Sequence, residues 1–187
     1  MQKFRKIGIL SSGGDAPGMN AAIRAVTRRA LSQGIEVVGI LGGYAGLLGA
    51  ADESDPDVIR EKHLRPLDAH SVSNIVTRGG TILGTSRTPF KRIDTPEADG
   101  VEKVPAMKQT YHDLNLDCLF MLGGNGSTKT ANRLSQEGLN VIALPKTIDN
   151  DTWGTEMTFG FTSAVEIATK CIDDIHTTAS SHGRVFV

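Results

Sequence analysis

Apolar segments of strand length alternate with amphipathic segments of helix length along most of this chain. Strands are predicted over residues 6–10, 36–41, 117–122 and 141–144, and helices over 17–33, about 101–116, from after Ser127 to Glu137, and 162–178. This alternation favours an α/β fold with three layers, in which helices flank a mostly parallel sheet. The first strand–helix–strand unit should cross over in the right-handed sense. Residues 51–70 give no clear pattern.

The composition excludes several classes of partner. Twenty Lys and Arg against 21 Asp and Glu leave a formal net charge of −1, so no positive field recruits nucleic acid or an anionic membrane. No apolar run approaches the ~20 residues that a membrane span needs. Cys118 and Cys171 fall in apolar-periodic segments, which predicts two core thiols rather than a disulfide. We therefore expect a cytoplasmic protein without nucleic-acid or membrane partners.

Glycine is unusually frequent and clustered. It accounts for 21 of 187 residues, about 11% against a usual ~7%, and pairs occur at 13–14, 42–43, 79–80 and 123–124. Paired glycines after strands let the backbone approach a ligand closely. In open α/β sheets, ligands bind beyond the carboxyl ends of the strands. The glycine pairs therefore predict ligand-binding loops.

Two of these loops lead into predicted helices and a third ends in arginine. Residues 11–20 and 123–127 offer backbone N–H groups at helix starts, where a phosphate is favoured. Residues 79–88 end in Arg87 and Thr88, and Arg87 can clamp a phosphate. Taken singly, each has a plain alternative: a tight turn that binds nothing, or a solvated arginine. The first loop matches neither a Walker A motif nor GxGxxG.

The fourth loop, residues 145–151, gathers charged side chains after a strand. Asp149 and Asp151 lie two residues apart, beside Lys146 and Thr147. In phosphoryl transfer an aspartate can accept the proton of the acceptor hydroxyl, while a lysine neutralises phosphate charge. A self-capped turn is the alternative. Four such loops in one sheet favour phosphate chemistry.

The motifs in these loops resemble the 6-phosphofructokinase family, bacterial type. The resemblance rests on Gly-Gly-Asp-Ala-Pro-Gly-Met-Asn at 13–20, Gly80-Thr81 through Arg87, Gly-Gly-Asn-Gly-Ser at 123–127 and Thr-Ile-Asp-Asn-Asp at 147–151, in the family's order from Lys6 to Val187. It implies a phosphofructokinase-like fold. It also implies an enzyme that converts fructose 6-phosphate to fructose 1,6-bisphosphate with ATP and Mg²⁺, in glycolysis.

The same resemblance assigns residues to roles. Catalysis would fall to Asp149 as base, Thr147 and Lys146, and the sugar would contact Thr147, Ile148 and Asp149. The donor would be bound by Gly14, Tyr44, Arg87, Thr88, Gly124, Asn125, Gly126 and Ser127. Asn125, where the family usually has aspartate, and Asp151 would be the metal ligands.

Arg24 and Arg28 match arginines that bind a regulatory ligand across a subunit boundary. Their spacing of four residues puts both on one helix face. A solvated helix face is the alternative. The resemblance further implies an allosteric homotetramer for the complete protein.

The phosphoryl donor is left open by two positions. Lys146 replaces a glycine usual in ATP-dependent bacterial enzymes and resembles pyrophosphate-dependent relatives. Gly126 favours ATP, because the pyrophosphate type often has a larger or acidic residue there. ATP is the preferred donor, and a pyrophosphate-dependent phosphotransferase is the alternative.

Family members are considerably longer, and this chain stops where another strand is expected. Arg184 to Val187 reads as the opening of an apolar strand. We therefore expect residues 1–145 to form the donor-binding domain, and 146–187 the catalytic loop and the beginning of a truncated sugar-phosphate-binding domain. A non-catalytic phosphate-binding fragment is an alternative of another class. Trp153 is expected to pack under the Asp149 turn.

Overall fold

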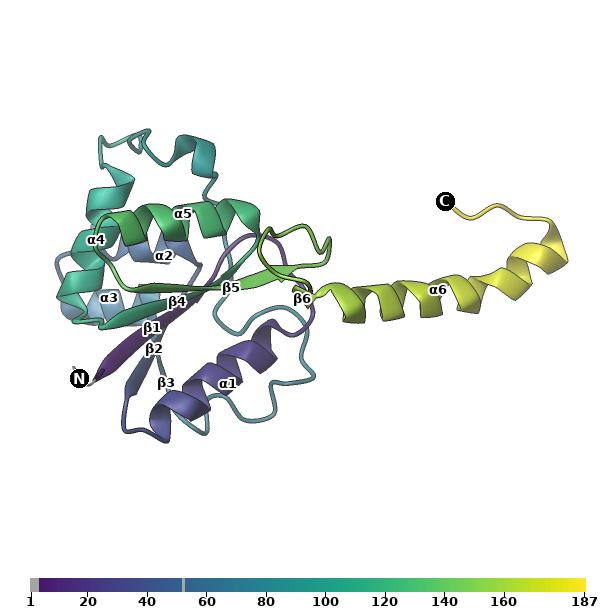
Figure 1. Ribbon diagram of the computed structural model, residues 1–187, viewed down its shortest axis with the longest axis horizontal. Helices are drawn as coiled ribbons and strands as arrows, with labels where there is room; N and C mark the ends of the chain where they lie inside the picture. Colours follow the sequence, from purple (N-terminus) through teal and green to yellow (C-terminus); the bar gives the residue numbers. More distant parts are fainter. Residues whose placement is uncertain (1–3, 52) are drawn as a thin grey trace.

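The computed structural model describes residues 4–51 and 53–187 and contains one six-stranded sheet. Its strands are β1 (Lys6–Ser11), β2 (Glu36–Ile40), β3 (Leu64–Leu67), β4 (Cys118–Gly123), β5 (Val141–Thr147) and β6 (Phe159–Gly160). They lie in the order β3-β2-β1-β4-β5-β6 (Figure 1). Every neighbouring pair is parallel except β2 and β3. The predicted, mostly parallel sheet is confirmed.

Helices cover both faces of this sheet. The helices on the sheet are α1 (Met19–Leu31), α2 (Tyr44–Gly49), α3 (Pro56–His63), α4 (Lys103–Asp113) and α5 (Asn125–Gln136), with a short 3-10 turn, η1, at Phe90–Arg92. A sixth helix, α6 (Phe161–His182), follows β6. In Figure 1, α1 lies below the sheet, whereas α2, α4 and α5 lie above it. The three predicted layers are therefore present.

Alternating side chains of the central strand supply both halves of the core. Ile7 and Ile9 of β1 pack with Ile23 of α1 on one face, whereas Leu10 packs with Met107 of α4 on the other. Because β1 is buried on both faces, its sequence is a continuous apolar run rather than an alternating one. Burial of each large apolar side chain contributes about 1.5–3 kcal/mol.

The order of the strands creates a switch point between β1 and β4. From β1 the chain passes outward through β2 and β3, and then returns to add β4, β5 and β6 on the other side of β1. The connection after β1 therefore leads to β2 on one side, and the connection after β4 leads to β5 on the opposite side. A crevice at such a point is where open α/β sheets bind ligands.

Two elements within residues 51–70 were not predicted. In α3, the Asp55 carboxylate caps the helix by accepting a hydrogen bond of 2.9 Å from the Asp57 N–H, and Pro56 occupies the first turn. Asp-Pro is a recognised start signal for a helix. The following strand, β3, contains Pro66, which an edge strand tolerates. The short helix α2 was also missed.

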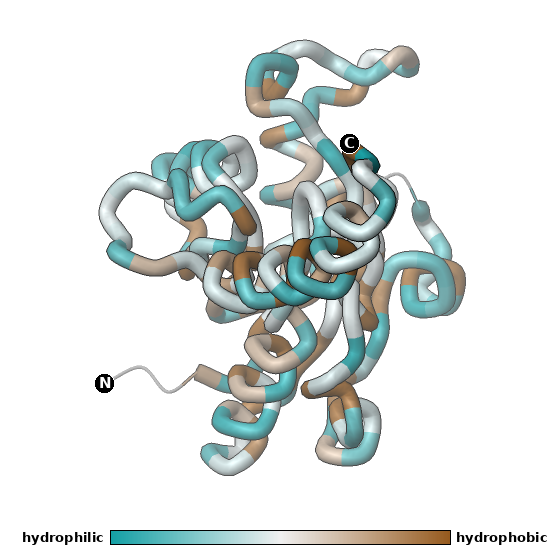
Figure 2. The backbone as a smooth tube through the Cα atoms, turned by 90° about the vertical axis from the view of Figure 1, so that its right-hand side faces the viewer, coloured by the Kyte–Doolittle hydropathy of each residue, from teal (hydrophilic) through white to brown (hydrophobic). Residues whose placement is uncertain are grey.

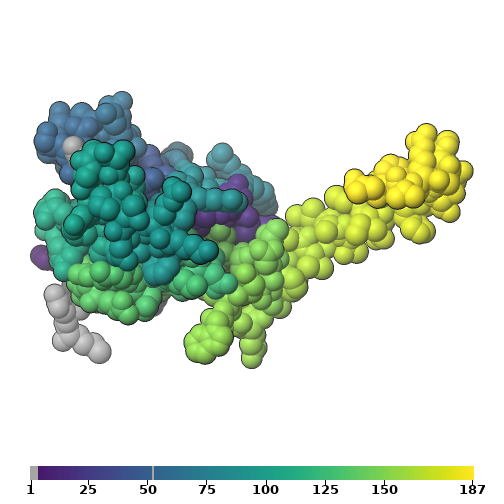
Figure 3. All heavy atoms as spheres, turned by 90° about the horizontal axis from the view of Figure 1, so that it is seen from above, coloured from purple at the N-terminus to yellow at the C-terminus, as the bar shows by residue number. Residues whose placement is uncertain are grey.

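The predicted C-terminal helix is confirmed as α6, but its surroundings differ from the prediction. It projects from the sheet beyond β6 (Figures 1 and 3) and has no buried residue. The prediction that Cys171 is a core thiol is therefore wrong, whereas Cys118 is buried as predicted. The expected strand at Arg184–Val187 is also wrong, since no described strand lies beside this segment to pair with it.

Trp153 also differs from the prediction, because its side chain is 95% exposed rather than packed under the Asp149 turn. The loop that carries it is closed by polar contacts. The Asn150 side-chain oxygen accepts a hydrogen bond of 2.9 Å from the Thr158 N–H. An apolar side chain is not needed to hold such a loop.

Hydrophobic and hydrophilic residues both occur along α6, as the tube in Figure 2 shows. On its polar side Lys170 and Asp174 form an ion pair of 2.8 Å at a spacing of four residues. None of the helices in the described ranges is both long and apolar enough to cross a membrane.

The close approach of α2 to the end of β2 yields a stability prediction. In Gly46→Ala the added Cβ would lie 1.8 Å from the carbonyl oxygen of Leu41, a backbone atom that cannot rotate away. We expect the free energy of unfolding to fall by about 1–3 kcal/mol, measured by urea denaturation, even though alanine favours helix more than glycine does.

Gly79→Ala is the matched control, because a Cβ there meets no atom within 4 Å. It should change the free energy of unfolding by less than about 0.5 kcal/mol. Equal stability of Gly46→Ala and the parent protein would contradict the close packing of α2 on β2.

Candidate active site

A cavity of about 600 Å³ lies beyond the carboxyl ends of β1, β4 and β5. Four loops line it, and each loop was singled out in the sequence. The lining residues are Ser12, Gly13, Gly14, Asp15, Arg87, Thr88, Pro89, Phe90, Gly124, Asn125, Gly126, Ser127, Lys146, Thr147, Ile148 and Asp149. The cavity therefore occupies the switch point between β1 and β4 and extends over β5.

The loop after β1 is held by the segment that follows Gly84. The Gly13 N–H donates to the Ser86 carbonyl at 2.9 Å, and the Thr85 hydroxyl donates to the Gly13 carbonyl at 2.7 Å. Gly13 has a φ of 87°, which a residue with a side chain adopts only at a cost. These bonds leave Gly14 and Asp15 at the rim of the cavity, where Gly14 was predicted to bind the donor.

The loop after β4 brings the start of α5 to the cavity. Gly124 precedes the helix without a side-chain cap, so the first N–H groups of α5 lack a capping acceptor. Such a helix start favours a bound anion. The Ser127 hydroxyl donates to the Ser12 hydroxyl at 2.9 Å, and this bond joins the β4 loop to the β1 loop.

Tyr44, which is predicted to contact the donor phosphates, is not among the residues that line the cavity. Its side chain is fully buried in the core, and its hydroxyl donates to the Ser127 carbonyl at 3.0 Å. Burial raises the pKa of this phenol far above its usual value. Tyr44 therefore connects the core to the first turn of α5.

Lys146 is the penultimate residue of β5 and joins this strand, and the loop that follows it, to the loop after β1. Its side chain is only 3% exposed, and its ammonium donates to the Gly14 carbonyl. Burial lowers the pKa of Lys146, as the charge of Arg87 also does, while the charge of Asp15 opposes this effect. A buried cation with one carbonyl partner is well placed to gain from an anionic ligand.

The two carboxylates of this loop occupy different positions. Asp149 lines the cavity, is exposed, and donates its N–H to the Thr147 hydroxyl at 3.1 Å. Asp151 is outside the cavity lining, and its carbonyl and carboxylate oxygens accept from the Asn125 amide at 2.9 and 3.3 Å. The two residues that are predicted to bind the metal, Asn125 and Asp151, are therefore in contact.

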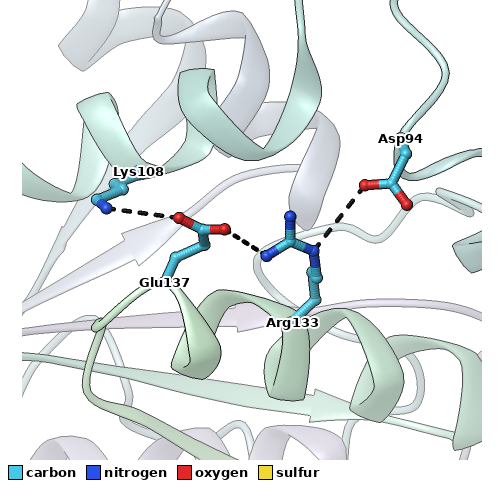
Figure 4. A network of polar contacts seen from close by, with 4 residues as sticks. All are labelled: Asp94, Lys108, Arg133 and Glu137. Carbon is cyan, nitrogen blue, oxygen red and sulfur yellow. Dashed lines mark hydrogen bonds and ion pairs between the residues drawn. The ribbon is translucent and has the colours of Figure 1, made fainter.

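A network of ion pairs connects α5 with α4 and with the segment that follows Arg87 (Figure 4). Arg133 of α5 lies 3.9 Å from Asp94 and also pairs with Glu137, which in turn lies 3.6 Å from Lys108 of α4. The hydrogen bond from Arg133 lowers the pKa of Glu137. Among these contacts, the pair of Arg133 with Asp94 is the one that reaches the segment after Arg87, and an exposed pair of this kind contributes little to stability.

The two predicted effector residues lie on α1, away from the cavity lining. Arg24 donates to the Val72 carbonyl at 2.6 Å, whereas Arg28 is exposed. Pro89 and Phe90 line the cavity but were missed in the sequence. Their position directly after Arg87 and Thr88 was the only available signal.

The arrangement places positive and negative groups at defined points of one cavity. Lys146, Arg87 and the start of α5 attract a polyphosphate, whereas Asp149 offers a carboxylate to a hydroxyl acceptor. Within residues 4–51 and 53–187, no three His, Cys, Asp or Glu side chains gather as a ready metal site. The cavity therefore suits transfer between a phosphate-bearing donor and an alcohol.

Comparison with known proteins agrees with this chemistry. "ATP-dependent 6-phosphofructokinase" of Spirochaeta thermophila is 55% identical over 98% of this chain and 48% of its own length. "ATP-dependent 6-phosphofructokinase 3" of Bacteroides thetaiotaomicron is 47% identical over 97% of this chain and 51% of its own. The chain thus spans about half the length of the curated relatives it matches.

Solved structures give the same result. Phosphofructokinase from Saccharomyces cerevisiae has a TM-score of 0.76 at 32% identity, covering 96% of this chain and 25% of its own. A pyrophosphate-dependent phosphofructokinase from Marinobacter aquaeolei has a TM-score of 0.68 at 21% identity, covering 95% of this chain and 42% of its own, and shares the fold. The family model described as phosphofructokinase matches residues 6–187. This chain belongs to the phosphofructokinase family.

Proposed function

We propose that the full-length protein transfers a phosphoryl group from ATP to fructose 6-phosphate and forms fructose 1,6-bisphosphate. One observation carries the proposal: the donor loops and the Asp149 carboxylate line the same cavity at the switch point of the sheet. Phosphoryl transfer requires a charged cradle for the phosphates and a group that receives the proton of the hydroxyl.

The donor phosphates would lie against Gly14, Arg87 and residues 124–127. Backbone N–H groups at the start of α5 supply hydrogen-bond donors that need no reorganisation during the reaction. Arg87 is exposed, and its Nη2 lies 3.7 Å from the position that a Cβ would take on Gly14. It can therefore close over a phosphate from the open side of the cavity.

Asp149 would accept the proton from the sugar hydroxyl as that oxygen attacks the terminal phosphorus. Its own N–H is held by Thr147, which fixes the backbone of the base. Thr147 and Ile148 line the cavity next to it and would contact the reacting end of the sugar. Lys146 would neutralise charge that develops on the transferred phosphoryl group.

The residues present fit a Mg²⁺ ion that arrives with the donor. Mg²⁺ is usually held by one or two carboxylates together with substrate phosphates and water. Asp151 supplies a carboxylate and Asn125 an amide oxygen, and hydrogen bonds hold the two side chains together. When bound, Mg²⁺ neutralises phosphate charge.

Two observations favour ATP as the donor. The similar curated proteins are named ATP-dependent, and the cavity has free space beside Gly126. A Cβ on Gly126 would meet no atom within 4 Å, and Pro89 and Phe90 offer apolar surface nearby. Lys146 favours pyrophosphate, because a donor without a nucleoside depends on the phosphate-binding cations alone. Pyrophosphate is therefore the second candidate.

We further propose a donor-binding domain at 1–145, followed at 146–187 by a catalytic loop and the first part of the sugar-phosphate-binding domain. We also propose that the full-length protein is a cytoplasmic homotetramer under allosteric control through Arg24 and Arg28. The bond from Arg24 to the Val72 carbonyl gives that arginine a second role, in holding the loop beside α1.

Replacement of Asp149 tests the catalytic assignment. We expect Asp149→Ser in the full-length protein to lower kcat by about 10²–10⁴-fold, with little change in KM for fructose 6-phosphate, because the base acts mainly in the transition state. Steady-state kinetics measure both constants. Asp149→Asn, which keeps the shape of the side chain, should be equally impaired. An unchanged kcat would show that Asp149 is not the catalytic base, whereas absence of turnover in the parent protein would favour a non-catalytic phosphate-binding protein.

Replacement of Lys146 tests donor selection. Lys146→Gly should raise the ratio of kcat/KM for ATP to that for pyrophosphate, because the smaller donor loses a larger share of its contacts. Lys146→Met separates charge from volume and should shift the ratio in the same direction. If the ratio stays at the parent value in both variants, Lys146 does not select the donor.

A further inference from the structure

Asn150 lies between the two carboxylates of the site and has an unusual backbone conformation. Its φ is 50°, in the left-handed region that residues with side chains seldom adopt. This turn separates its neighbours: Asp149 lines the cavity, whereas Asp151 contacts Asn125 at the start of α5. The direction in which each carboxylate leaves the loop depends on this residue.

Both polar atoms of the Asn150 side chain are engaged within the loop. Its oxygen accepts from the Thr158 N–H at 2.9 Å, and its nitrogen donates to the Glu156 carbonyl at 3.2 Å. These bonds join the two arms of the loop across residues 150–158. A side chain so engaged is not free to contact substrate.

Thr158 extends this connection to the strand that carries the catalytic residues. It is 3% exposed, and its hydroxyl donates to the Thr147 carbonyl at 2.8 Å. The next two residues, Phe159 and Gly160, pair with Lys146 and Thr147 in the sheet. A continuous path of hydrogen bonds therefore runs from Asn150 through Thr158 to β5.

We propose that Asn150 is a positioning residue for the reaction, which holds the turn that presents Asp149 to the cavity and Asp151 to Asn125. This inference rests on the proposed function, because it assigns Asn150 an effect that is exerted through Asp149. Displacement of a reacting group by about 1 Å can cost on the order of a hundredfold in rate. Loss of the Asn150 bonds should therefore impair chemistry more than binding.

Asn150→Gly in the full-length protein removes both side-chain bonds and keeps the left-handed backbone accessible. We expect kcat to fall by about tenfold to a hundredfold, with KM for fructose 6-phosphate and ATP changed by less than about threefold. Asn115→Gly is the matched control: Asn115 has a φ of 53°, lies just beyond the end of α4, and its side-chain amide donates to the nearby Asp113 carbonyl. Its kcat should equal that of the parent.

A double variant tests whether Asn150 acts through Asp149. Asn150→Gly should cause no further loss of kcat when Asp149 is already serine, because groups that act as a unit are not additive. Full additivity, or a kcat within twofold of the parent in the single variant, would overturn the inference. A normal kcat in Asp149→Ser alone would instead refute the catalytic role of Asp149, and absence of activity in the parent protein would refute the proposed function.

Thr158 supplies a second route if Asn150→Gly does not fold. Thr158→Val removes the hydroxyl that donates to Thr147, and Thr158→Ser retains it. The valine variant should show the same selective loss of kcat, whereas the serine variant should keep a kcat close to that of the parent. Equal kcat values in these two variants would also overturn the inference.

Discussion

The carboxyl ends of β1, β4 and β5 lie side by side because the three strands are hydrogen-bonded in parallel. Ser11 is opposite Leu122, and Gly123 is opposite Pro145, so the segments that follow each strand start at the same edge of the sheet. The same register brings Gly13, Gly124 and Lys146 to one cavity although they are far apart in sequence. The apolar strands thus determine where the polar chemistry occurs.

The parallel strands bring these loops together, and hydrogen bonds between the loops fix their relative positions. The Ser127–Ser12 pair joins the loops after β4 and β1, and Lys146 joins the end of β5 to the loop after β1. Each bond of this kind contributes about 0.5–1.5 kcal/mol to stability. Their larger effect is on preorganisation, since a cradle formed before the ligand arrives loses little entropy on binding.

Much of the fold follows from the periodicity of the sequence, whereas several positions depend on tertiary contacts. The apolar run at Ile7–Leu10 predicted β1, and the helical spacing that ends before Gly34 predicted α1. The glycine motifs placed most of the cavity lining correctly. The burial of Tyr44 was not predicted, because a tyrosine beside a glycine pair carries no signal that distinguishes a ligand contact from a core residue.

The periodicity of the sequence also does not show which helix faces are covered or which residues adopt a left-handed backbone. Cys171 has the spacing of a buried residue on α6, yet nothing in the described part of the chain covers that face. Asn150 passed unnoticed because its conformation, rather than its type, gives it importance. An asparagine between two aspartates after a strand was the available indication of a left-handed turn.

We propose that the loops after β1, β4 and β5, together with the segment of Arg87, form a phosphate-binding site. Thermal unfolding with Mg²⁺ and either ATP, pyrophosphate or adenosine tests it most directly. A ligand at about 100 times its Kd stabilises the folded state by about 2.7 kcal/mol, which gives a clear rise in Tm. We expect this rise with ATP and no rise with adenosine. Pyrophosphate should raise Tm only if Lys146 suffices to bind a donor without a nucleoside. An unchanged Tm with both phosphate ligands, or an equal rise with adenosine, would contradict it.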